Sequence, residues 1–135
     1  MTALALPYWH VDAFAARPFA GNQAAVMELG RWLPDETLQA IAEENKFAET
    51  AFVVRDESGE ADWELRWFTP ACEIRLCGHA TLASGHVLLG RDGGARVTFR
   101  TRKAGALEVR RMAGGGYELA LPAIPTVRGE WPEAV

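Results

Sequence analysis

Apolar positions alternate or cluster in short runs along most of this chain and change to helical spacing in two places. Strands are expected at residues 8–14, 24–29, 46–54 and 61–68, where the runs are short and apolar or alternating. Three more runs, separated by turns, predict a meander over residues 95–101, 106–112 and 117–121. Leu38, Ile41 and Ala42 recur at helical spacing after Pro34, so we expect a helix that ends near Asn45.

A strand, turn and helix at residues 66–89 form the stretch around which the remaining elements are arranged. Thr69-Pro70 ends the strand because proline cannot donate to a ladder. Residues 78–89 are nearly all apolar or small, and a helix that is apolar on all sides belongs inside a domain. Its length of about 18 Å is too short to cross a bilayer. We therefore predict a buried central helix.

The start of this helix is a candidate anion site. Its first backbone N–H groups have no partner within the helix, and the helix dipole adds partial positive charge there. Gly78 allows a ligand to approach the backbone closely, His79 adds a side-chain donor, and Ala80 completes the first turn. The alternative is structural, with Gly78 easing the turn and His79 capping the helix. A thiol at such a helix start, as at Cys77, is expected to have a lowered pKa.

Two further polar residues are candidates for chemistry. Glu49 lies inside an apolar strand, and half-burial there would raise its pKa toward the range that a general base needs. The alternative is a glutamate at the strand edge that points into water. Asn22 lies in a loop between the first two strands, where it either binds a ligand or bonds its own backbone.

Composition narrows the class of protein. The 135 residues suffice for one domain, and with 49% hydrophobic and 24% charged residues the chain should fold. A net charge of -4 argues against nucleic acid as a partner. With no leader peptide and no membrane segment recognised, we expect a cytoplasmic protein. We assign residues 1–121 to the folded domain and the proline-punctuated residues 122–135 to a linker.

Cysteine usage and glycine placement give no sign of a cofactor or metal. Cys72 and Cys77 fit reduced cytosolic thiols. His79 and His86 lie nearby, but the spacings typical of zinc sites are missing, so we predict no metal. The run Gly114-Gly115-Gly116 lies between strands and is not followed by a helix, so it is not a dinucleotide fingerprint.

Several stretches together resemble one known family. They are VDAF at residues 11–14, RPFAGN at 17–22, ETAF at 49–52, RWFTP at 66–70 with Glu73, and LCGHATLA at 76–83. In this order they are similar to the phenazine-biosynthesis (PhzF-type) isomerase and epimerase family, whose fold is related to diaminopimelate epimerase. The similarity spans about residues 8–122, which corresponds to the first of the family's two lobes.

The resemblance implies an α+β fold in which a mixed, rolled sheet wraps around a buried central helix. It also implies an active site between two lobes, where two central helix starts face each other. By this resemblance Glu49 takes the place of the catalytic acid/base, and Gly78, His79 and Ala80 hold the substrate. Asn22 matches a loop that contacts substrate.

The implied activity is cofactor-independent proton transfer on a small carboxylate metabolite. The second lobe, with its aspartate, would follow in a longer chain, come from a partner chain, or be imitated by a second copy in a homodimer. The resemblance also implies that Cys77 is not the base, so we interpret it as a packing residue. Two alternatives remain open: a binding module that holds a small anion without chemistry, and a racemase that uses the Cys77 thiol. Arg75 stands where the family often has aspartate, and Gln23 replaces a usual proline.

Overall fold

The computed structural model of this chain describes residues 6–13 and 22–120. The helices are α1 (Asp35–Asn45) and α2 (Gly78–Asp92). The strands are β1 (Tyr8–Ala13), β2 (Asn22–Leu29), β3 (Glu49–Arg55), β4 (Trp63–Phe68), β5 (Glu73–Ile74), β6 (Arg96–Arg100), β7 (Ala106–Arg111) and β8 (Tyr117–Ala120).

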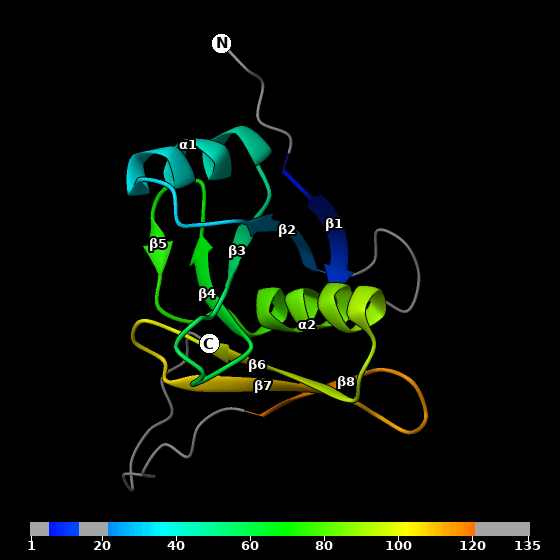
Figure 1. The fold of residues 1–135 in the computed structure, drawn as a ribbon. Coiled ribbons are helices and arrows are strands. Elements are labelled where there is room, and N and C mark those ends of the chain that lie inside the picture. Colours follow the sequence, from blue (N-terminus) through cyan, green and yellow to red (C-terminus); the bar gives the residue numbers. More distant parts are fainter. Residues whose placement is uncertain (1–5, 14–21, 121–135) are drawn as a thin grey trace, which may run out of the picture.

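All eight strands belong to one mixed sheet. Its order is β1-β2-β3-β4-β6-β7-β8, and the short β5 pairs with β4. The β2–β3 and β4–β6 pairs are parallel, and the other pairs are antiparallel. Helix α2 contacts β1, β2 and β3 at one end of the sheet and β6, β7 and β8 at the other, with the sheet curled around it (Figure 1). The predicted α+β fold with a rolled sheet around a central helix is thus confirmed.

Helix α1 covers the opposite side of the β2–β3 region from α2 (Figure 1). Asp35 and Glu36 place negative charge in its first turn, where the helix dipole favours it. Lys46 ends the helix in a left-handed conformation, with φ 58°, and donates its N–H to the Ala42 carbonyl. Buried Leu38 and Ala42 of α1 pack against apolar side chains of β2, β3 and β4, and this cluster is separate from the one around α2. This packing explains why the predicted 3.6-residue spacing produced a helix.

Helix α2 runs to Asp92, three residues beyond the predicted end at residue 89. Gly90, the residue after the predicted end, lies within α2, is exposed, and has open space around it. The helix ends at Gly93, where a φ of 79° suits glycine. Buried Thr81 and Ser84 donate their hydroxyls to carbonyls one turn back, at Cys77 and at Ala80 respectively, so the buried polar groups are satisfied.

Helix α2 lies so close to the sheet that one of its positions must be glycine. A Cβ at Gly85 would meet the Val109 side chain at 2.5 Å. We expect Gly85→Ala to destabilise the fold by about 1–3 kcal/mol, because it overpacks a dense core. Chemical denaturation measures this free energy. Gly90→Ala in the same helix is the matched control and should be neutral or stabilising by up to about 1 kcal/mol. Equal effects of the two substitutions would contradict the close approach.

Strand boundaries differ from the prediction where backbone geometry intervenes. Strand β3 begins at Glu49 and not at residue 46, because Lys46 belongs to the end of α1. Strand β5 was not predicted, since two residues are too short for a periodic signal.

The predicted linker at residues 122–135 lies outside the described part of the chain. None of the helices in the described ranges is both long enough and apolar enough to span a membrane.

Candidate functional site

Glu49 and His79 meet at the start of α2, although 29 residues separate them in the sequence. Glu49 is the first residue of β3 and His79 the second residue of α2. His79 Nε2 lies 2.5 Å from Glu49 Oε2, and the two side chains are 17% and 16% exposed. The pair is therefore neither deeply buried nor free in solvent, which is the setting expected of residues at the wall of an open site.

Glu49 Oε2 is a buried oxygen that lacks a conventional hydrogen bond from the described residues. The contact with His79 Nε2 is close, but the ring nitrogen does not direct an aligned N–H at this oxygen. A buried polar atom without such a partner carries a desolvation cost, which a ligand can remove. The carboxylate is thus available to accept a proton or to bind a cation.

Cys77 is the residue that precedes α2, and its side chain lies against the His79 ring. The sulfur is 3.6 Å from Nδ1 and 3.9 Å from Nε2, and the residue is only 5% exposed. Burial raises the pKa of the Cys77 thiol to about 12, although the backbone N–H groups of Ala80 and His79 act in the opposite direction. The nearby charge of Glu49 raises it further. The expected lowering of this pKa was wrong, because desolvation outweighs the helix start.

A buried hydrogen-bond relay holds the start of α2 in place. The indole Nε1–H of Trp67 donates to Thr81 Oγ1 at 3.1 Å, and the Thr81 hydroxyl donates to the Cys77 carbonyl at 2.7 Å. Trp67 is 2% and Thr81 is 0% exposed. The relay links β4 to the first turn of α2 and thereby fixes the direction of its first N–H groups.

The first N–H groups of α2 lie at the candidate site and lack backbone acceptors. Thr81 N–H is the first to find a backbone acceptor, the Cys77 carbonyl at 3.1 Å. The N–H groups of Gly78, His79 and Ala80 precede it and have no backbone acceptor within the described ranges. The arrangement can hold a carboxylate next to Glu49.

Gly78 is not required by packing inside this chain. A Cβ there would lie 3.7 Å from Leu119, which is ordinary van der Waals contact. Asn22 begins β2, and the parallel register that pairs Ala24 with Glu49 places the backbone of residue 22 near the same end of the sheet. The side chain of Asn22 lies outside the description, so its predicted contact with substrate stays a prediction.

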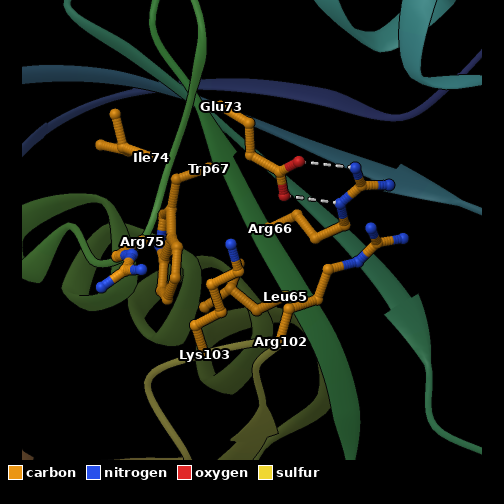
Figure 2. A pocket seen from close by; sticks show the side chains of 8 residues that line it. All are labelled: Leu65, Arg66, Trp67, Glu73, Ile74, Arg75, Arg102 and Lys103. Carbon is orange, nitrogen blue, oxygen red and sulfur yellow. Dashed lines mark hydrogen bonds and ion pairs between the residues drawn. The ribbon is translucent and has the colours of Figure 1, made fainter.

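A separate pocket of about 170 Å³ lies at the edge of β4, between β5 and the turn after β6 (Figure 2). Its lining comprises Leu65, Arg66, Trp67, Glu73, Ile74, Arg75, Arg102 and Lys103. Trp67 belongs to this lining as well as to the relay described above. Among the described side chains, those of Glu49, His79 and Ala80 do not line this pocket, and neither does Gly78.

Arg66 on β4 holds the segment that leads to α2. Its guanidinium donates to Glu73 at 2.8 Å and 2.7 Å, as Figure 2 shows, and to Asp35 at 3.0 Å. Trp32 and Phe68 lie beside the same guanidinium. These contacts tie α1, β4 and β5 together just before the residues of the candidate site. They also give Glu73, part of the RWFTP motif region, a structural role.

Sequence comparison identifies the family of this chain. A model of the phenazine biosynthesis-like protein family, PhzC-PhzF, matches residues 11–130. This chain belongs to the PhzC-PhzF family. The resemblance noted from motifs is therefore confirmed, and the matched region includes Glu49, Cys77 and His79.

Curated relatives of this PhzC-PhzF chain include proteins named as isomerases. One from Pseudomonas aeruginosa, named an uncharacterized isomerase, is 54% identical over 108 residues, which cover 78% of this chain and 40% of the relative. The human phenazine biosynthesis-like domain-containing protein is 44% identical over 127 residues, covering 89% of this chain and 43% of that protein. The chain thus spans less than half the length of these relatives.

Solved structures in the family share the fold. A putative phenazine biosynthesis PhzC/PhzF protein from Clostridium difficile superposes with a TM-score of 0.74 at 48% identity, covering 81% of this chain and 41% of that one. A predicted epimerase from Pseudomonas aeruginosa gives a TM-score of 0.68 at 31% identity, covering 84% and 41%.

The structure brings together Glu49, Gly78, His79 and Ala80 from the predicted set. Trp67 and Thr81, which support the helix start, were not predicted as part of the site. Only the spacing of Thr81, four residues after Cys77, could have indicated that its hydroxyl bonds to the helix start.

Proposed function

We propose that this chain supplies one wall of an isomerase site that moves a proton on a small carboxylate metabolite without a cofactor. The observation that carries the proposal is the contact of Glu49 with His79 beside the N–H groups at the start of α2, which have no backbone acceptor within the described ranges. A base and an anion-holding helix start at one place are the two parts that such a reaction needs. Membership in a family of isomerases agrees with this reaction class.

Glu49 takes the proton in the proposed reaction. Its carboxylate removes a proton from a substrate carbon, becomes a carboxylic acid, and returns the proton to another carbon or to the opposite face of the same carbon. The N–H groups of Gly78, His79 and Ala80 hold the substrate carboxylate or the charge that develops beside it. His79 keeps Glu49 in position through their close contact.

The proposed site is completed by protein beyond the described residues. The first turn of α2 and Glu49 form one wall, and the relatives are more than twice as long as the part that this chain matches. A second lobe in a longer chain, a partner chain or a second copy of this chain would supply the facing wall. Sedimentation equilibrium distinguishes the last of these, because a monomer at all concentrations contradicts a homodimer.

The proposal is tested by exchange of substrate protons with solvent. The protein that contains the complete site is incubated in ²H₂O with a panel of small carboxylates, and proton NMR follows loss of the C–H signal. Exchange that depends on the protein is the expected result. Binding of the same carboxylates without any exchange would replace the proposal with the alternative of a non-catalytic anion-binding module.

Gly78 offers a test of substrate holding that is separate from folding. Because a Cβ at Gly78 meets only ordinary contact inside the chain, Gly78→Ala should change stability by less than about 1 kcal/mol. It should nevertheless weaken binding of the carboxylate substrate, since the added methyl group occupies the helix start. Calorimetric titration and thermal denaturation measure the two quantities. Unchanged affinity would remove Gly78 from the site.

The thiol racemase alternative is disfavoured by the raised pKa of Cys77. A pKa of about 12 leaves the buried thiol protonated near neutral pH, and a protonated thiol is a poor base. We expect Cys77→Ser to retain proton exchange within about tenfold of the unchanged protein, far from the loss expected at an essential acid or base. Loss of exchange in Cys77→Ser, together with inactivation by iodoacetamide that substrate prevents, would establish the thiol mechanism instead.

A further inference from the structure

Three side chains that can bind a metal ion come together at the start of α2. Glu49, Cys77 and His79 each offer one ligand atom, and these atoms all lie within 4.8 Å of one another. We propose that this cluster is a binding site for Zn²⁺, and that the bound ion blocks Glu49 as a base. The proposal departs from the expectation of no metal, which considered spacing near the cysteines and did not include Glu49.

The distances suit a tetrahedral ion after small side-chain movements. Bond lengths to zinc of about 2.3 Å for sulfur and about 2.0 Å for nitrogen and oxygen imply ligand separations of about 3.5 Å for sulfur–nitrogen and about 3.3 Å for nitrogen–oxygen. The Cys77 Sγ–His79 Nε2 distance is 3.9 Å, and the His79 Nε2–Glu49 Oε2 distance is 2.5 Å.

The charges and ligand types also favour zinc. Thiolate, imidazole and carboxylate are the ligands that zinc prefers, whereas Mg²⁺ and Ca²⁺ prefer oxygen alone. A thiolate, a carboxylate and a neutral imidazole balance the two charges of the ion in this half-buried place. Glu49 Oε2, which has no conventional hydrogen bond, gains a partner. Three protein ligands leave a fourth position for water.

Binding requires that Cys77 lose its proton. The S–H bond breaks, the sulfur lone pair binds the ion, and the proton passes to solvent, with no oxidant or reductant involved. Because binding releases this proton, the apparent affinity should rise with pH.

The test uses the tag-free chain with Co²⁺ and Zn²⁺ as probes. One Co²⁺ per chain should give a near-ultraviolet thiolate-to-metal absorption band that Zn²⁺ abolishes. Cys77→Ser should remove the band, and Glu49→Gln and His79→Asn should each weaken affinity by more than the roughly 10–100-fold that loss of an outer-shell partner costs. Cys72→Ser and His86→Asn are matched controls, because both residues are exposed and outside the cluster; they should leave the band unchanged.

The metal proposal and the proposed isomerase function fail in different ways. Absence of the band, or a band that disappears in Cys72→Ser and persists in Cys77→Ser, overturns the metal site. If Glu49→Gln and His79→Asn both bind Co²⁺ with unchanged affinity, the metal site is also overturned. If one of the other variants does not fold, Glu49→Gln alone still tests the site. Because the probe is the ion alone, an inactive chain that binds zinc would leave the metal site standing.

Discussion

Glu49→Gln should lower the rate of substrate proton exchange by about 10²–10⁴-fold, which is the usual contribution of a general base. The amide preserves the shape of the side chain but cannot accept a proton at carboxylate strength. Exchange of substrate protons in ²H₂O, measured by NMR under saturating substrate, gives the rate. Affinity for the carboxylate should change much less, because the N–H groups of α2 remain.

Glu44→Gln is the matched control for this substitution. Glu44 lies in α1 and is exposed. Its replacement by glutamine removes the same charge as Glu49→Gln but lies outside the candidate site. It should leave the exchange rate within about twofold, as expected for a surface substitution. Comparable rates for Glu49→Gln and the unchanged protein would assign the proton transfer to another group.

Trp67→Ala should destabilise the fold by about 3–5 kcal/mol, the typical cost of truncating a buried aromatic residue. Trp67 is 2% exposed and packs in the apolar cluster around α2, so the surrounding residues can fill the cavity only in part. The substitution also removes the indole donor to Thr81 Oγ1. A lowering of Tm by roughly 10–20 °C in thermal denaturation is the expected reading for a domain of this size.

Two companion variants separate packing from the hydrogen bond. Trp67→Phe keeps most of the ring volume but deletes the donor, so it should cost less than the alanine variant. Met112→Ala is the surface control, because Met112 is 50% exposed, and its effect should be within about 0.5 kcal/mol. If the Trp67→Ala and Met112→Ala proteins unfold at the same temperature, β4 does not support the helix start as described.

Elements with a continuous pattern could be predicted from the sequence because their signal is local. The apolar content of α2 identified a buried helix, and the spacing of Leu38 and Ala42 identified α1. The end of α2 was misplaced since Gly90 is compatible with a helix, and the true end depends on the backbone conformation at Gly93. Strand β5 was missed because two residues carry no period.

The candidate site could be predicted in its members but not in its electrostatics. The motifs around Glu49 and residues 76–83, through their similarity to a family, named residues that the fold brings to one place. The pKa of Cys77 was expected to fall, yet it rises, because the burial of its sulfur depends on side chains that are distant in sequence. Spacing rules for metal sites failed to include Glu49 for the same reason.

The sequence by itself determined the residue types, the buried helix and the family to which the chain belongs. Only the tertiary structure decided that Glu49, Cys77 and His79 share one place, that Gly85 must lack a side chain and Gly78 need not, and that Trp67 supports the helix start. The physical reason is that the spacing of apolar residues, which predicts helices and strands, depends only on residues that are close together in the sequence. Distances, burial and charge depend on how the sheet curls around α2.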